Sequence, residues 1–315
     1  MADSRSTPAR LSLRAAFALL LISALPAHAA DLARVTSPDK QLVVVVESQH
    51  EGRPSYRVER NGQAVIAPSR LGMLLGDGRL ERNVALTGQS QRSFDETWEQ
   101  PWGERRLTRN HYNELRASFT EKPGAGRNYE RRFDVVFRVY DDGIGFRYEF
   151  PQQAGMKQAQ IHAELTEFAL ARPATAWWIP AFEWNREEYL YHQTPLKEVG
   201  TAQTPLTLRS DNGLHISIHE AALVDYAGMN LARGDGDILR ATLTPSSSGA
   251  PVVRTLPFNT PWRTITIGEK AGDLAESSLI LNLNEPNAIG DVSWFKPAKY
   301  AGVWWSLHLS LIHIS

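Results

Sequence analysis

The sequence predicts an all-β fold, a large antiparallel β-sandwich. Short segments of alternating polar and apolar residues follow one another from about residue 32 to residue 283, separated by turn pairs such as Asn61-Gly62. Helical periodicity is scarce, since only residues 187–192 and 272–280 show it, and both stretches are short. Many strands without alternating helices favour an antiparallel sandwich over a doubly wound sheet.

The stretch "FDVVFRVY" shows the strand pattern in detail. Its odd-numbered side chains share one face of a strand: Phe133, Val135, Phe137 and Val139. Its other face carries polar and apolar residues together, so the pattern predicts a sheet with one buried face. Asp141 and Asp142 follow directly, and we interpret them as hairpin-turn residues whose side chains bond nearby backbone amides.

Composition excludes some classes of function. The chain has 315 residues, of which 42% are hydrophobic, and it contains no cysteine. This length and apolar content suffice for one large core. The formal net charge is −1, so nothing in the charge balance indicates binding to nucleic acid or to an anionic membrane.

The N-terminus is typical of a secretory signal peptide, residues 1–29. Arg5, Arg10 and Arg14 precede the apolar stretch "AAFALLLISAL", and small residues follow at the cleavage positions. We expect cleavage after Ala29 or Ala30, a periplasmic or secreted bacterial protein, and no membrane span after cleavage. Without cysteine, an exported chain depends on core size rather than on disulfides for its stability.

Residues 31–295 are predicted to form the sandwich domain, and the stretch that follows differs from it. Pro297 precedes a compact apolar run at residues 300–309, which predicts a buried strand opening a second domain. Such a strand has nothing to pair with in the remaining sequence, so we expect a truncation within residues 296–315. We also expect that residues 310–315 are not native.

Four segments resemble one family. They are "FRVYDDGIGFRYEF" (137–150), "HEAALVDYAGMNL" (219–231), "TPWRTITIGEKAGDLAESSLILNLNEP" (260–286) and "DVSWFKPAKYAGVWW" (291–305). In order and spacing they are similar to the N-terminal portion of glycoside hydrolase family 97. The resemblance runs from about Leu32 to Leu309, and its specificity comes from the agreement of four unrelated segments.

The resemblance implies a galactose-mutarotase-like super-sandwich followed by the truncated start of a (β/α)8 barrel. It implies an exported, calcium-dependent α-glycosidase acting on small α-linked oligosaccharides. We predict an α-glucosidase first and an α-galactosidase second. The sandwich would pack on the barrel and lend a calcium ligand. Active sites of such barrels lie at the C-terminal ends of the strands, so the catalytic carboxylates have no counterpart in this chain, which is expected to be inactive alone.

The calcium ligand falls in "REEYLY". The family has a "YExLY"-like segment there, and the resemblance aligns Glu188 with its glutamate and Tyr191 with its last tyrosine; Glu187 is the second choice. A carboxylate among aromatic rings is poorly solvated, and a divalent ion is one partner that would stabilise it. The alternative is that both glutamates lie on a solvated turn.

Other candidates carry less weight. Trp304 and Trp305 could stack on sugar rings, although core packing accounts for at least one of them. His219 and Glu220 could lie at a domain junction, although a polar pair after a strand more often begins a turn.

Two other functions remain open from the sequence. One is a stand-alone, non-catalytic carbohydrate-binding sandwich. The other is an aldose mutarotase, which needs a histidine acid and a glutamate base in one groove; the residues of the right types are His215, His219 and Glu220.

Overall fold

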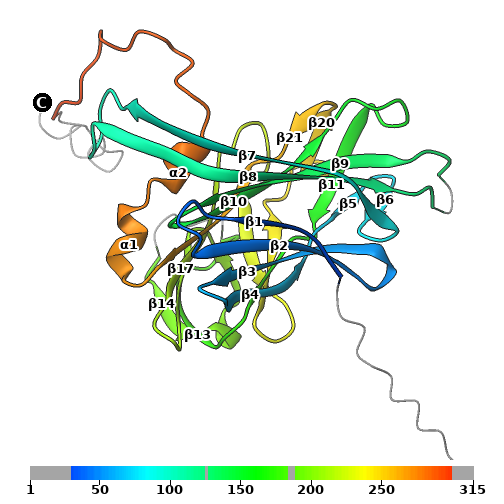
Figure 1. The fold of residues 1–315 in the computed structure, drawn as a ribbon, viewed down its shortest axis with the longest axis horizontal. Coiled ribbons are helices and arrows are strands. Elements are labelled where there is room, and N and C mark those ends of the chain that lie inside the picture. Colours follow the sequence, from blue (N-terminus) through cyan, green and yellow to red (C-terminus); the bar gives the residue numbers. More distant parts are fainter. Residues whose placement is uncertain (1–29, 125–126, 184–188, 300–315) are drawn as a thin grey trace, which may run out of the picture.

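The computed structural model describes residues 30–124, 127–183 and 189–299. Within these residues the regular structure is almost entirely β, with strands β1 to β22 and two short α-helices. The strands pair antiparallel throughout the described chain. The predicted all-β antiparallel fold is therefore confirmed. Figure 1 shows the long strands β7 and β8 along the top, with β1–β4 below them.

The largest sheet has ten strands. In spatial order they are β14 (His192–Pro195), β13 (Ala174–Trp178), β16 (Leu206–Ser210), β17 (His215–Ala221), β22 (Trp262–Gly268), β10 (Gly143–Phe150), β9 (Arg131–Tyr140), β8 (Leu107–Glu121) and β7 (Val84–Glu99), with β21 (Phe258–Asn259) also on β10.

Two further sheets complete the sandwich. The eight-stranded sheet runs β1 (Ala30–Thr36), β2 (Leu42–Gln49), β3 (Arg53–Arg60), β4 (Gln63–Arg70), β12 (Glu167–Leu170), β19 (Ile238–Leu243), β18 (Met229–Arg233) and β15 (Thr201–Gln203). The four-stranded sheet runs β20 (Val252–Thr255), β11 (Gln158–Glu164), β5 (Met73–Leu75) and β6 (Gly78–Leu80). Single 3-10 turns occupy His50–Gly52 and Leu196–Glu198.

The main core lies between the sheets. The predicted face of β9 is buried, with all four of its odd-numbered apolar side chains in the main hydrophobic cluster. Tyr56 from β3 meets Phe146 from β10 with ring centroids 4.8 Å apart, and Phe137 stacks on Phe146 at 5.4 Å. The two large sheets are thus joined through interlocking aromatic side chains.

The outer face of the ten-stranded sheet differs from the prediction of a single buried face. Val136 and Tyr140 on β9 are also buried, in a second cluster with Trp262. The cover comes from α1 (Ala271–Glu276) and α2 (Leu279–Leu283), which pack on the sheet after β22. Strand alternation alone does not show that a later segment returns over this face.

The structure tests one helical prediction in full and the other over residues 189–192. The pattern at residues 272–280 matches α1 and α2, so it is confirmed. The pattern at 187–192 is wrong for its described part, since residues 189–191 are not helical and His192 begins β14.

Asp141 and Asp142 form the hairpin turn after β9 as predicted, but their side chains bond distant segments and not the nearby backbone. Asp141 accepts a hydrogen bond from the backbone N–H of Asp39 at 2.9 Å, and Asp142 accepts one from the Ser277 hydroxyl at 2.6 Å. The two carboxylates therefore fasten distant segments to the turn, and Asp142 anchors the stretch between α1 and α2.

Two glycines on β10 form the seat of α2. A Cβ added to Gly145 would lie 2.5 Å from Leu283 Cδ1, and one added to Gly143 would lie 2.5 Å from the Ile265 carbonyl oxygen and 3.1 Å from Leu279 Cδ2. The absence of side chains at these positions lets the helix approach the sheet closely.

Substituting Gly143 by alanine should destabilise the fold. The new methyl group would press on backbone that cannot rotate away, so we expect Gly143→Ala to lower the free energy of unfolding by about 1–3 kcal/mol. Gly88 on β7 is the matched control, because its nearest neighbour would be 3.7 Å away. Urea unfolding of both variants tests this; equal stabilities would contradict the close seat.

Candidate functional site

The predicted calcium ligands, Glu187 and Glu188, lie outside the described residues, but the segments on either side are defined. The backbone N–H of Ala181 donates to the Thr201 carbonyl at 2.9 Å, and that of Gln203 donates to the Ile179 carbonyl at 3.0 Å. After β13 the chain thus leaves the ten-stranded sheet and joins β15 of the eight-stranded sheet. The loop that carries the glutamates starts where these two sheets meet.

The return of this loop is also fixed. Trp178 donates from Nε1 to Thr194 Oγ1 at 3.1 Å, and its ring lies 4.9 Å from that of His192. Closer to the glutamates, the Tyr189 hydroxyl donates to the Glu183 carbonyl at 2.8 Å. Hydrogen bonds and ring contacts therefore define both ends of residues 179–192.

No metal site forms from the described residues alone. Among them there is no group of three or more His, Asp or Glu side chains that could hold an ion. Calcium takes six to eight oxygen ligands. Calcium binding at Glu187 or Glu188 therefore stays a prediction.

His219 and Glu220 lie on opposite faces of β17, as neighbouring strand residues must. His219 sits on the outer face opposite Thr264, where burial lowers its pKa. Glu220 points into the sandwich and accepts hydrogen bonds from Arg263 Nη1 at 2.6 Å and from the Met229 N–H at 3.0 Å. Its carboxylate is thus used inside the domain, and a junction role stays a prediction for His219.

The same geometry argues against the aldose mutarotase hypothesis, because the candidate acid and base do not face each other. His215 and His219 share the outer face of β17, whereas Glu220 occupies the inner face, so they cannot line one groove.

Arg263 is the centre of a buried ion cluster. Its guanidinium bonds Glu164 Oε2 at 2.5 Å as well as Glu220. Glu164 also accepts from the Thr166 hydroxyl at 2.8 Å. Burial raises the pKa of Glu220, against the opposing effect of Arg263. One cation beside two carboxylates in the interior makes the protonated form of Glu220 easier to reach.

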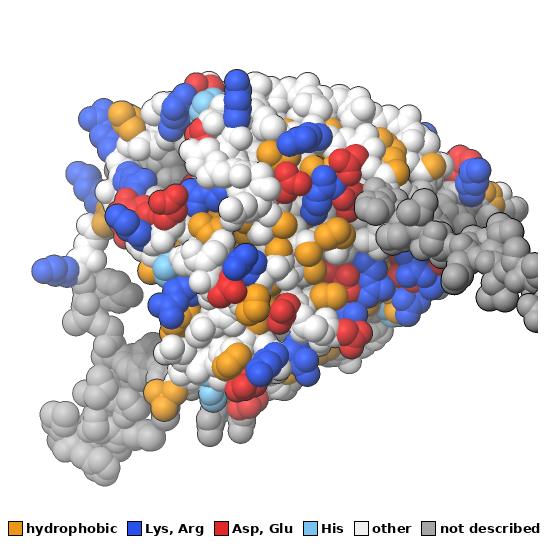
Figure 2. Space-filling model, turned by 60° about the horizontal axis from the view of Figure 1, so that its bottom comes forward, with side chains coloured by type: hydrophobic (Ala, Val, Ile, Leu, Met, Phe, Trp, Pro, Cys, Tyr) orange, Lys and Arg blue, Asp and Glu red, His pale blue; other side chains and the backbone are white. Residues whose placement is uncertain are grey.

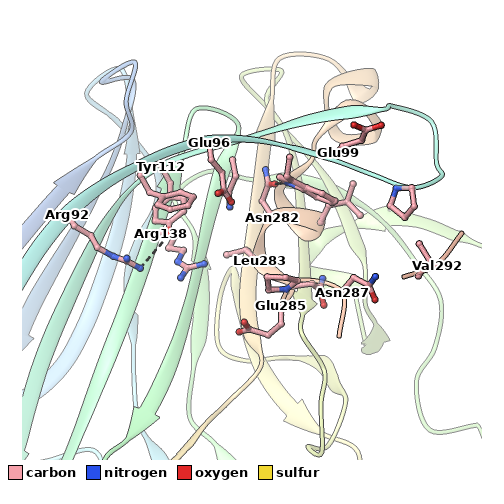
Figure 3. A pocket seen from close by; sticks show the side chains of 17 residues that line it. Arg92, Glu96, Glu99, Tyr112, Arg138, Asn282, Leu283, Glu285, Asn287 and Val292 are labelled. Atoms are coloured by element: carbon pink, nitrogen blue, oxygen red, sulfur yellow. Dashed lines mark hydrogen bonds between the residues drawn. The ribbon is translucent and has the colours of Figure 1, made fainter. Parts of the chain in front are cut away.

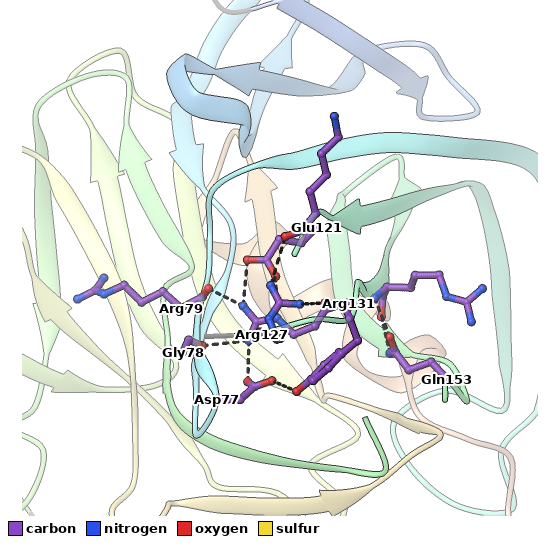
Figure 4. A network of polar contacts seen from close by, with 10 residues as sticks. Asp77, Gly78, Arg79, Glu121, Arg127, Arg131 and Gln153 are labelled. Carbon is purple, nitrogen blue, oxygen red and sulfur yellow. Dashed lines mark hydrogen bonds and ion pairs between the residues drawn. The ribbon is translucent and has the colours of Figure 1, made fainter. Parts of the chain in front are cut away.

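A second ion network has a structural role. Arg131, itself buried, donates to Asp77 at 2.6 Å and to Glu121 at 2.7 Å, and Arg127 also pairs with Glu121 (Figure 4). Burial disfavours the charged form of Arg131, but these partners outweigh it and raise its pKa. Because Arg131 bonds the β5–β6 turn to Glu121 at the end of β8, the network holds two hairpins together.

A groove of about 1020 Å³ opens on the outer face of the ten-stranded sheet (Figure 3). Phe94, Trp98 and Tyr112 from β7 and β8 line one side, and α2 with the residues that follow it lines the other. Polar side chains at its edge include Arg92, Glu96, Arg138, Asn282 and Asn287. The arrangement combines aromatic surface with groups that can donate and accept hydrogen bonds.

The remaining candidates add no second site. Trp304 and Trp305 lie outside the described residues. Trp177 lies under the Arg209 guanidinium, 5.7 Å from it. On the face shown in Figure 2, acidic and basic side chains are interspersed. Among the described residues no helix is long and apolar enough to cross a membrane.

The three sheets and the helix seated on two glycines define a large antiparallel β-sandwich domain. The family model "Glycosyl-hydrolase 97 N-terminal" matches residues 35–286. The chain belongs to glycoside hydrolase family 97, and the matched part is its N-terminal domain. The resemblance seen in the sequence is thereby confirmed.

Relatives show both the likeness and its extent. The family 97 enzyme of Pseudoalteromonas sp. strain K8, solved in complex with panose and with acarbose, is 46% identical with a TM-score of 0.83, over 88% of this chain and 42% of that one. The "Retaining alpha-galactosidase" of Bacteroides thetaiotaomicron is 26% identical over 86% of this chain and 44% of its own. The "Probable retaining alpha-galactosidase" of Streptomyces bingchenggensis is 29% identical, over 95% and 46%. The chain spans less than half of each relative.

The Arg263 cluster and the groove were not predicted. The cluster leaves a signal in the sequence, because Arg263 falls on the same strand face as Ile265 and Ile267, and Glu220 on that of Ile216 and Ile218. Charges at apolar positions of two strands indicate a buried pair. The groove leaves no comparable signal, since its walls are far apart in the sequence.

The raised pKa of Glu220 predicts a pH dependence of stability. As the pH rises above the ordinary carboxyl value of 4.5, the unfolded chain loses this proton while the folded chain keeps it. The free energy of unfolding then falls by about 1.4 kcal/mol per pH unit from this group until the pH passes the folded pKa. Below 4.5 the contribution is fully present.

Urea unfolding between pH 4.5 and 7 tests this with Glu220→Gln. The free energy of unfolding of Glu220→Gln should fall less steeply with rising pH than that of the wild type. Glu96→Gln, at an exposed carboxylate of β7, should show the same dependence on pH as the wild type. If the free energy of unfolding of Glu220→Gln depended on pH as that of the wild type does, the Glu220 carboxylate would be ionised in the folded protein over this range.

Proposed function

We propose that this chain is the N-terminal part of an exported, calcium-dependent α-glucosidase that cleaves small α-linked oligosaccharides. The observation that carries the proposal is the 46% identity to an enzyme solved with panose and acarbose, against 26% and 29% to the α-galactosidases. An α-galactosidase is the second candidate, because those relatives carry that name.

The resemblance assigns proton transfer to a catalytic domain and calcium binding in part to this N-terminal domain. The carboxylates that exchange protons with the substrate would belong to the part of the relatives that this chain does not cover. Bound calcium would orient the substrate and polarise it as a Lewis acid. Glu188 would hold the ion from a loop that is braced by Trp178, His192 and Thr194.

Substrate preference is tested on a protein that carries this chain together with a catalytic domain like that proposed here. We expect it to release glucose from panose, and to hydrolyse a p-nitrophenyl α-glucoside on the order of 100-fold faster than the α-galactoside, as kcat/KM. The two sugars differ in the orientation of one hydroxyl group, which a hydrogen-bonding site distinguishes strongly. A preference for the galactoside would select the second candidate.

Calcium binding is tested at the two glutamates in the same longer protein. Glu188→Gln should raise the calcium concentration for half-maximal activity by on the order of 10-fold, because a neutral amide is a weaker ligand than a carboxylate. It should also reduce the calcium-induced rise in Tm. Glu187→Gln is the matched control and should change neither; the reverse pattern would assign the ligand to Glu187.

Export is tested at the N-terminus. Strand β1 begins at Ala30, so cleavage after Ala29 would leave the first strand whole. We expect the protein from the periplasm or medium to begin at Ala30 or Asp31 by mass spectrometry. Recovery of uncleaved protein from the cytoplasm alone would contradict export.

A further inference from the structure

The β7–β8 hairpin extends beyond the sheet to which it belongs. β7 and β8 pair from Val84 and Glu121 out to Glu99 and Leu107, whereas β9 pairs with β8 only from residue 113 onward. Residues 94–112, here called the arm, are therefore a two-stranded ribbon without a third strand in the described chain. An isolated ribbon of this kind is marginally stable in water, so its order depends on what its face contacts.

Asn282 of α2 contacts both strands of the arm. Its Oδ1 accepts from Trp98 Nε1 on β7 at 2.9 Å, and its Nδ2 donates to the Arg109 carbonyl on β8 at 2.9 Å. Only 6% of Asn282 is exposed. A buried amide that is bonded at both ends is costly to misplace, so Asn282 sets the distance between the arm and the helix.

Further contacts continue along the arm to its tip. The Trp102 ring lies 4.5 Å from that of Phe295, and the Trp294 ring lies 4.4 Å from that of Phe295. Arg105 forms an ion pair with Glu276, the last residue of α1. The arm thus touches the 276–295 segment at its beginning, its middle and its end.

These contacts are few and separated. The groove of about 1020 Å³ lies between the arm and residues 281–292, so the packing there is not continuous (Figure 3). α2 has five residues, too few to be helical without external support. The position of the segment therefore depends on its individual anchors.

We propose that the arm is a clasp that fixes residues 279–295 against the sandwich, with Asn282 as its central positioning residue. The segment is then a rigid strut. If this domain precedes a catalytic domain, as the proposed function holds, the strut sets the direction in which the polypeptide leaves the sandwich. That second consequence rests on the proposed function; the clasp itself does not.

Hydrogen exchange of the 315-residue chain, followed by mass spectrometry, tests the clasp. Trp98→Phe keeps an aromatic ring and removes the Nε1 donor. We expect the amides of Asn282 and Asn284, bonded to Ser278 and Leu281, to exchange about tenfold faster, as for one lost hydrogen bond. Asn282→Ala, which removes both contacts, should produce a larger effect.

Trp178→Phe is the matched control, because Trp178 also donates from Nε1 to a side-chain oxygen, that of Thr194. It should leave the exchange of residues 279–295 unchanged, and peptides from β9 should stay protected in every variant. Unchanged exchange in both Trp98→Phe and Asn282→Ala, or an equal effect of the control, would overturn the clasp. The measurement needs no catalysis, so a lack of glycosidase activity would overturn only the proposed function.

Discussion

The buried ion cluster around Arg263 is the constraint on which the arrangement of the sheets depends. Arg263 on β22 joins Glu164 on β11 and Glu220 on β17, and Glu220 in turn receives the N–H of Met229 on β18. These strands belong to three different sheets. Removal of the cation would leave two carboxylates uncompensated in the interior, which is far more costly than the loss of a surface pair.

The ten-stranded sheet connects the loop that carries the predicted calcium ligands with the seat of α2. One row of paired residues runs from Trp177 on β13, through β16, β17 and β22, to Gly143 on β10. The first end of the row lies at the base of the loop that carries the predicted calcium ligands. The other end is part of the seat of α2. The loop and the helix are thus held by the same hydrogen-bonded strands.

Packing on the outer face of the ten-stranded sheet also determines the position of α2. Glycines at two places on β10 let Leu279 and Leu283 approach, and this brings Asn282 within reach of Trp98. A side chain at either glycine would displace the helix from the arm. Local backbone choices in one strand therefore determine how residues 279–295 run along the molecule.

Much of the fold followed from the sequence, and the exceptions have physical reasons. Alternation in β9 and the Asn61-Gly62 turn predicted strands and a hairpin, because one face of β9 is continuously apolar and Asn-Gly suits a tight turn. The arm escaped prediction because most of its residues on β7 are exposed on both faces, so no alternation marks it. The groove and the clasp depend on contacts between residues about 180 positions apart, such as Trp98 and Asn282, which no local pattern records.

The calcium site at residues 187–188 lies outside the described residues and stays a prediction, whereas the faces of the other candidates can be compared with the sequence. Acidic residues among aromatic ones pointed to residues 187–188, while the side-chain direction of Glu220 required knowledge of which face of β17 is internal. Strand parity could have supplied it, since Ile216 and Ile218 share that face. The distant partners of Asp141 and Asp142 had no such signal.

The most direct test of the function proposed for this domain is a crystal structure of the longer protein with calcium and panose. The expected result is a carboxylate oxygen of Glu188 at about 2.3–2.6 Å from the ion, with residues 279–295 held under the arm. A calcium ion coordinated without either Glu187 or Glu188 would contradict the role assigned to this domain.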